Sequence, residues 1–245
     1  MFLLVFGLVL VAVGALIALT SPDDRGFALL GLLPWGVGSV AVASTPFLTR
    51  EAAAVRLEEL SGRRSGPAVV FPFSRAKQRL GFIGQVSFVF LGLAVALYTD
   101  GFVIGVICMA MFGLFALITL PSAIGRRGGV ALLPAGVLVR GALGDSFLPW
   151  EQIEDLQDVE IHGSRMLGIA ASDPAKLEVP PGTRLLSRAN RALGYRSDLS
   201  IAAASLIGDL EVVAAAIEYE LIHPEHRSRL GTRESLEDLD LAAAL

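Results

Sequence analysis

Residues with catalytic or metal-binding potential are few in this chain. His223 and His226 lie three positions apart with Glu225 between them, and His162 is the third histidine. Two ligands do not complete a zinc site without a third, and Pro224 interrupts the helix that would align the pair. An interfacial enzyme that acts through His223 or Glu225 is therefore the weakest of the function classes we consider.

No motif of a known catalytic class accompanies these residues. The sequence has no GxSxG, no P-loop, no glycine-rich dinucleotide turn after a strand and no HExxH. Cys108 is the single cysteine, so it cannot form an intrachain disulfide or a thiolate zinc site. We interpret Trp150 as core packing. The sequence thus predicts no enzyme activity, no cofactor, no metal and no evident small-molecule substrate.

Two groups of basic residues are candidates for contact with lipid. Three arginines at i, i+4 and i+7 share one face of a helix predicted within 182–197, and a basic amphipathic helix can lie on anionic lipid. A second group forms a basic collar just before an apolar stretch, where it anchors the chain or binds a specific lipid or partner. For the first group we favour an ordinary solvated face, with contact to lipid as the alternative. The six candidates are Arg75, Lys77, Arg79, Arg184, Arg188 and Arg191.

Four apolar stretches without ionisable side chains occupy the first half of the chain, and they would position the candidate residues relative to a membrane. Each is 19 to 23 residues long, and at about 1.5 Å per residue each can cross a hydrocarbon core of about 30 Å. We predict four transmembrane helices arranged as two hairpins. The first stretch lacks a basic n-region, so we expect a retained anchor rather than a cleaved signal peptide. The stretches are Phe2 to Thr20, Phe27 to Thr49, Leu80 to Tyr98 and Gly101 to Leu120.

Loop charge predicts the orientation of these helices. The segment from Arg50 to Arg79 has seven Lys or Arg against three Glu, and Arg126 and Arg127 follow the fourth stretch. The two short turns together have a single Arg. Because cytoplasmic loops collect Lys and Arg, we expect a multi-pass protein of the cell (inner) membrane with both termini cytoplasmic.

Polar and small residues inside the stretches have two interpretations each. Gln85 could line a transport pathway or hydrogen-bond a neighbouring helix, and we favour the structural role. Gly101 and Gly105 form a GxxxG pair that packs helices within the bundle or between two copies. Prolines do not break the stretches at mid-span, as a transporter binding site would require.

Beyond the fourth stretch the chain reads as a small soluble domain. Residues Arg126 to Leu245 contain 12 Lys or Arg against 18 Asp or Glu, and this acidic balance argues against nucleic-acid binding. Docking of the basic middle loop onto this acidic half is a hypothesis. Residues 50–60 are predicted to form a short helix. We divide the chain into a membrane region (1–125, with the basic loop 50–79), a domain (126–230) and a frayed or disordered tail (231–245).

Within 126–230 the pattern predicts about seven short strands and a closing helix. Alternating aliphatic residues around turn signals indicate strands. Asp209 is a plausible N-cap for the helix, which Pro224 ends. The expected strands are 130–133, 137–140, 146–149, 156–162, 166–171, 177–179 and 199–204, and the expected helix is 209–221.

Three short motifs carry a family resemblance. They are Leu133 to Val137 with Arg140, then Leu148 to Ile153, and His223 to Arg227 with Leu230. Over roughly 129–230 the chain resembles uncharacterised bacterial, actinobacterial-type membrane proteins with a pleckstrin-homology-like (PH-like) domain. The resemblance implies a small β-barrel capped by a helix, and so an α+β membrane protein. It brings no catalytic residues.

We therefore expect a non-enzymatic membrane protein that presents a PH-like module to protein partners or to its own copies. The bilayer is its other partner. An accessory subunit of a transporter or channel is the alternative function.

Overall fold

The computed structural model describes residues 2–21, 23–44, 55–60, 64–125, 128–161, 164–192, 194–195 and 197–243. The chain forms two compact units. The helical unit comprises Met1–Thr49 and Arg75–Arg126, and the β domain comprises Arg50–Ser74 and Arg127–Leu245. Segment 50–74, which we expected as a loop of the membrane region, thus belongs to the β domain. Segments 50–74 and 127–245 thus fold together, and the two helices between them leave and rejoin one domain.

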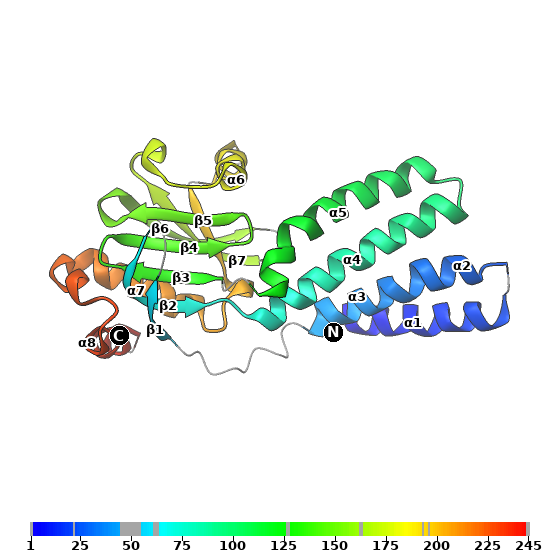
Figure 1. The fold of residues 1–245 in the computed structure, drawn as a ribbon, viewed down its shortest axis with the longest axis horizontal. Helices are drawn as coiled ribbons and strands as arrows, with labels where there is room; N and C mark the ends of the chain where they lie inside the picture. Colours follow the sequence, from blue (N-terminus) through cyan, green and yellow to red (C-terminus); the bar gives the residue numbers. More distant parts are fainter. Residues whose placement is uncertain are drawn as a thin grey trace. The chain divides into compact units, whose positions relative to one another are not determined.

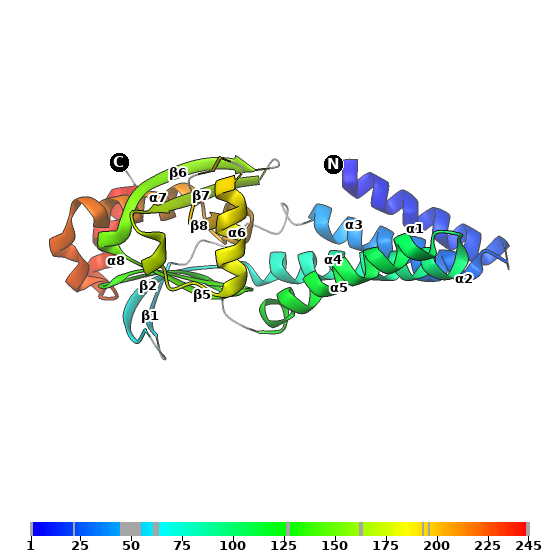
Figure 2. The ribbon, with the colours of Figure 1, turned by 90° about the horizontal axis from the view of Figure 1, so that it is seen from above.

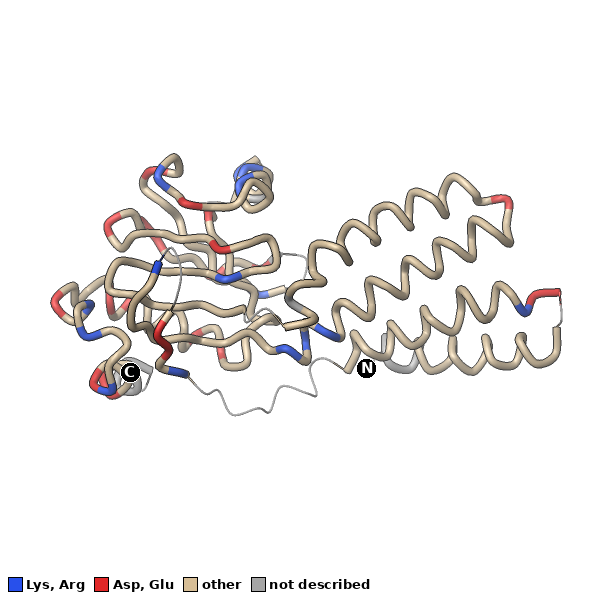
Figure 3. Tube along the Cα trace, viewed as in Figure 1, with Lys and Arg blue, Asp and Glu red and all other residues tan. Residues whose placement is uncertain are grey.

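The helical unit contains four apolar helical segments. They are α1 (Phe2–Thr20); a continuous helix formed by α2 (Arg25–Phe27), the π segment η1 (Ala28–Leu32) and α3 (Leu33–Ser44); α4 (Arg75–Tyr98); and α5 (Phe102–Ile124). Figure 3 shows charged residues only near the ends of these helices.

Three of the four segments are long and apolar enough to cross a membrane: Arg25–Ser44, Arg75–Tyr98 and Phe102–Pro121. In α1 the apolar run with described side chains, Gly7–Thr20, is shorter, so the fourth span stays a prediction. The predicted end of the second span, 45–49, lies outside the described residues.

The helices pack in sequence order, α1 on α3, α3 on α4 and α4 on α5 (Figure 1). A Cβ atom on Gly105 would lie 2.5 Å from the Gly92 carbonyl oxygen and 2.6 Å from the Ala96 nitrogen. Gly105 therefore brings α5 close to α4 within one chain, whereas Gly101 meets only Thr99 and Val95 beside it. The close approach at Gly105 supports the intrachain interpretation of the pair.

Gln85 takes part in the same helix pairing. Its Oε1 accepts a hydrogen bond of 2.6 Å from the Thr119 hydroxyl, which joins α4 to α5. The contact agrees with the structural role expected for Gln85, because each polar group finds its partner on the neighbouring helix.

Replacing Gly105 by leucine should push α5 away from α4. Overpacked interfaces typically lose about 1–3 kcal/mol, so the full chain in detergent should melt at a lower temperature by circular dichroism. Gly113→Leu is the control, because a Cβ atom on this glycine of α5 meets nothing within 4 Å. Equal melting temperatures for the two variants would contradict the packing described here.

The first sheet of the β domain has five antiparallel strands in sequence order. They are β1 (Arg56–Leu60), β2 (Gly66–Pro72), β3 (Gly129–Leu133), β4 (Gly136–Gly141) and β5 (Gly144–Pro149). The pairing of β2 with β3, from Val69 opposite Leu132 to Pro72 opposite Gly129, ties the middle segment to the C-terminal half. The docking hypothesis therefore understates the link, because the two segments share one sheet.

The helix predicted over 50–60 is wrong where the structure describes it, because 56–60 is strand β1. Residues 50–54 lie outside the described part of the chain. Glu58 and Glu59 suit a helix by propensity. Pairing with the apolar strand β2 and burial of Leu60 outweigh that preference.

The second sheet has three antiparallel strands, β6 (Ile153–Ile161), β7 (Ser164–Ala171) and β8 (Leu199–Ala202). The segment expected as a strand over 177–179 forms only an isolated bridge, Glu178 with Phe147. Among the described strands the two sheets do not join, so the closed barrel that we expected is not observed. Figure 2 shows the sheets as separate layers, with α6 (Pro181–Ala192) running from one toward the other.

Strand alternation gives the first sheet two buried faces. Val69, Val130 and Leu148 contribute to the larger core, whereas Val70, Ala131 and Phe147 contribute to a smaller cluster on the opposite face. Trp150, in the short 3₁₀ helix η3 (Trp150–Gln152), belongs to the larger core at 1 % exposure. Its Nε1 donates to the Leu133 carbonyl oxygen at 2.8 Å, which confirms Trp150 as a core residue.

Helix α7 (Leu210–Ile222) closes this core and confirms the helix predicted over 209–221. Asp209 occupies the N-cap position, although its side chain makes no capping hydrogen bond. The tail that we expected to be frayed or disordered forms α8 (Arg233–Ala243), and its Leu239 packs into the core. Burial of this leucine explains why an acidic tail stays ordered.

Candidate functional site

Helix α6 is fastened to the β domain by one buried carboxylate. Asp198 is 4 % exposed and accepts hydrogen bonds from the Ala171 backbone at 3.0 Å and the Ser187 hydroxyl at 3.1 Å. It also forms an ion pair with Arg191. Because Ala171 belongs to β7 while Ser187 and Arg191 belong to α6, Asp198 fixes the helix against the second sheet.

The arginine face of α6 borders pockets of its own domain, and its three arginines remain exposed. Arg184, Arg188 and Arg191 line pockets beside the segment 177–179, whereas Leu185 is 69 % exposed. The insert is a helix, as expected. Its basic row is neither a bare solvated face nor wholly available to lie on lipid, since part of it forms the wall of a groove.

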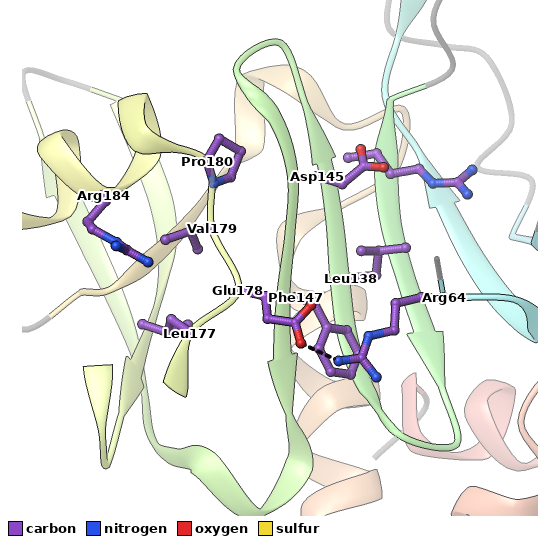
Figure 4. Close-up of a pocket in the computed structure, with 10 residues that line it drawn as sticks. Arg64, Leu138, Asp145, Phe147, Leu177, Glu178, Val179, Pro180 and Arg184 are labelled. Carbon is purple, nitrogen blue, oxygen red and sulfur yellow. Dashed lines mark hydrogen bonds and ion pairs between the residues drawn. The ribbon is translucent and has the colours of Figure 1, made fainter. Parts of the chain in front are cut away.

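A pocket of about 510 Å³ opens on the outer face of the first sheet (Figure 4). Leu138 and Arg140 are two residues apart on β4, as are Asp145 and Phe147 on β5, and all four line the pocket. Period-two alternation places such pairs on the same face of a sheet. The segment 177–180 and Arg184 complete the wall.

Arg64 reaches this pocket from the middle segment. Its Nη2 lies 2.6 Å from Glu178 Oε1, the ion pair marked in Figure 4, and its guanidinium carbon lies 4.1 Å from the Phe147 ring centroid. The Nε atoms of Arg64 and Arg140 are buried and have no hydrogen-bond partner among the described residues. A buried N–H group without an acceptor carries a desolvation cost in free energy.

A second pocket of about 370 Å³ adjoins the first, and the two share Leu177, Val179 and Arg184 as walls. Arg188, Arg191 and Asp198 line the second pocket. We call the two pockets together the arginine groove. It contains five arginines against three carboxylates: Arg64, Arg140, Arg184, Arg188 and Arg191 against Asp145, Glu178 and Asp198.

This positive excess is local. The β domain as a whole contains 15 Lys or Arg against 21 Asp or Glu, a net charge of −6, whereas the groove is at +2. A charge of one sign gathered in a concave, partly apolar site raises the local concentration of the opposite ion. The groove can therefore attract an anion that the rest of the domain repels.

The groove offers donors and apolar walls. Its described lining residues include neither histidine nor cysteine, and Ser187, the one hydroxyl, is engaged by Asp198. Guanidinium groups stay charged and donate in a planar fork that suits carboxylate or phosphate. The arrangement is suited to binding an anion.

Only some of the predicted contact residues come together. The three arginines of α6 meet in the groove, whereas Arg75, Lys77 and Arg79 belong to the first turns of α4 in the helical unit. Arg79 Nε donates to the Ala123 carbonyl oxygen at the end of α5 at 3.3 Å.

Sequence reasoning missed Arg64 as a site residue, and it named Arg140 only among the residues that carry the family resemblance. Arg140 faces Asp145 across that hairpin, and both lie on the groove side of the sheet. The alternation of side chains along β4 and β5 could have placed Arg140 and Asp145 on the same face of the predicted hairpin. Arg64 could not be found without the pairing of β2 with β3.

The described histidines form a stack with Tyr219. Its hydroxyl lies 2.7 Å from His226 Nδ1, and the rings of His223 and His226 are 5.4 Å apart. His162 lies outside the described residues. Among the described residues, no group of three or more His, Cys, Asp or Glu is arranged so that it could hold a metal.

Beside this stack lies a buried acid on α7. Glu220 is 1 % exposed, and its Oε2 has no hydrogen-bond partner among the described residues. Burial raises the pKa of its carboxyl from 4.5 to about 7, against the opposing influence of Arg227. The Glu220 carboxyl therefore changes its charge near neutral pH.

Comparison of this chain with protein-family models, with curated proteins and with solved structures gives no match.

Proposed function

We propose that this chain is a membrane-integral, non-catalytic recognition protein whose β domain is a PH-like module that binds an anionic ligand in the arginine groove. The observation that carries the proposal is the convergence of Arg64, Arg140 and Arg184 on one pocket from three distant segments. Three membrane-length helices would hold this module beside a bilayer. The orientation that loop charge favours puts the module in the cytoplasm.

The PH-like assignment draws support from element order. Six strands and a short bridge between residues 129 and 202 precede the closing helix α7. The strands β1 and β2 add to that pattern from the middle segment. The module departs from a closed barrel because its two sheets do not join among the described strands.

Recognition fits the groove better than catalysis does. The described lining supplies guanidinium donors and apolar walls but neither histidine nor cysteine, an inventory that suits holding an anion rather than reacting with it. Protein partners or further copies of the chain, which we expect on sequence grounds, would then respond to whether the groove is filled. In that case the module couples an anionic signal to assembly at the membrane.

The test is ligand-dependent stability of the β domain in the whole protein. The chain has two tryptophans, Trp35 in α3 and Trp150 in the β core. A Trp35→Phe chain in phosphatidylcholine nanodiscs therefore reports β-domain unfolding by Trp150 fluorescence. With sodium phosphate near ten times its dissociation constant, the free energy of unfolding should rise by about 1.4 kcal/mol over sodium chloride of equal ionic strength.

Phosphate also stabilises proteins without binding them. The gain in unfolding free energy is therefore measured in Arg140→Gln as well, which separates binding at the groove from this general effect. Arg165→Gln is the matched control. It removes one arginine from the same domain, at an exposed site where that arginine is paired with Asp158 and Glu211. A gain that Arg140→Gln abolishes and Arg165→Gln keeps supports the proposal. An equal gain in all three proteins, or no gain, would contradict it.

A further inference from the structure

We infer that the arginine groove takes a ligand with two phosphate groups, one held by Arg64 and Arg140 and the other by Arg184 and Arg188. This inference rests on the proposed function and names the ligand class. It follows from the pairing of two pockets: Arg64 and Arg140 line only the first, Arg188 lines only the second, and both border on Arg184 and on an apolar wall.

The first subsite lies where β4 meets the middle segment. Arg140 belongs to β4. The Arg64 guanidinium packs over the Phe147 ring and forms an ion pair with Glu178. Glu178 engages only Nη2 of Arg64, and within the described part of the chain the Nε–H groups of Arg64 and Arg140 have no acceptor. Donors from two directions suit a tetrahedral phosphate, whose oxygens point several ways, better than a single planar carboxylate.

The second subsite is on α6. Arg191 is already committed to Asp198, which is buried and satisfied by three donors. Arg184 and Arg188 are one helical turn apart and exposed, and both line the second pocket. Their side chains can therefore meet a second anionic group without breaking the contacts that hold the helix.

The wall between the subsites is apolar. Leu177 and Val179 border both pockets. The first pocket alone, at about 510 Å³, lies within the range of small-molecule sites, about 300–1,000 Å³. A ligand that spans both pockets thus has room for a short organic linker between its phosphates. Such a ligand is either a free bisphosphate or a lipid with two phosphates.

Calorimetry on the full chain in phosphatidylcholine nanodiscs tests the inference. Fructose 1,6-bisphosphate is compared with fructose 6-phosphate, and inorganic phosphate is titrated separately. Since the second phosphate binds within the same complex, the bisphosphate should bind about tenfold more tightly or better. Arg188→Gln should remove most of this ratio while leaving fructose 6-phosphate affinity nearly unchanged. Arg165→Gln should leave the ratio as it is.

A lipid arm distinguishes the source of the phosphates. Nanodiscs with cardiolipin are compared with phosphatidylglycerol nanodiscs of equal phosphate content, and Trp150 unfolding is followed in the Trp35→Phe background. Greater stabilisation by cardiolipin that depends on Arg140 and Arg188 indicates a lipid ligand. A preference confined to the free bisphosphate indicates a soluble one. Either result supports the two-phosphate ligand.

The two proposals fail in different ways. If inorganic phosphate binds through Arg140 but neither two-phosphate probe exceeds its one-phosphate counterpart, the two-phosphate inference is overturned and the proposed function stands. If no probe binds, including inorganic phosphate, both are overturned.

Discussion

Replacing Asp198 by alanine should lower the free energy of unfolding of the β domain by about 2–4 kcal/mol. The substitution leaves the Ala171 amide without its acceptor inside the domain and frees Ser187 and Arg191 from their common partner. Helix α6 then loses its attachment to β7. Urea unfolding of the Trp35→Phe chain, followed at Trp150, measures the loss.

Asp173→Ala is the matched control for this prediction. Asp173 also accepts a backbone hydrogen bond, from Ala175 at 3.0 Å, but its side chain is 44 % exposed. The loss there should stay below about 1 kcal/mol. Trypsin should cut the arginines of α6 faster in Asp198→Ala than in the parent chain. Equal stability of the two alanine variants would mean that Asp198 does not hold the helix.

Glu220 should make the β domain less stable as the pH rises from 4.5 to 7. The folded carboxyl has a pKa of about 7 and the ordinary value is 4.5. In this window the folded state keeps a proton that the unfolded state has lost, so stability falls with pH. The shift corresponds to a loss of about 3 kcal/mol, which is complete above pH 7.

Glu220→Gln should remove this dependence, because glutamine mimics the protonated acid. The variant should match the parent near pH 4.5 and exceed it at pH 8 by about 1–3 kcal/mol. The groups that act on Glu220 are Arg227, Asp238, His223 and Glu225, so the curves are compared at fixed ionic strength. Glu218→Gln, an exposed change on the same helix, should keep the parent slope. A parent curve that is flat between pH 4.5 and 7 would contradict the burial of an acid at this position.

The features predictable from sequence were those with strong local patterns. Apolar length identified the helices of the 25–44, 75–98 and 102–121 spans, and helical spacing identified α6 and α7. Trp150 as a core residue followed from residue type. In each case the residues that predict the element all lie within that element, because its apolar length or spacing is a local property of the sequence.

The features that were missed depend on pairing between distant segments. Strand β1 has helix-forming residues and becomes a strand only because β2 lies beside it. Likewise, α8 is ordered because Leu239 finds a core built by other elements. Arg64 and Arg184 are 120 positions apart and meet only after β2 pairs with β3. The groove therefore could not be predicted from local sequence patterns.

The measurement that tests the central claim most directly is the response of arginine Nε–H resonances to phosphate. In the full chain in nanodiscs, labelled at arginine nitrogen, titration with inorganic phosphate should shift the Arg64 and Arg140 signals together and saturably. The Arg165 signal should stay in place, since its Nε already donates to Asp158. Uniform small shifts of all arginine signals, or none at Arg64 and Arg140, would show that the groove does not recognise anions.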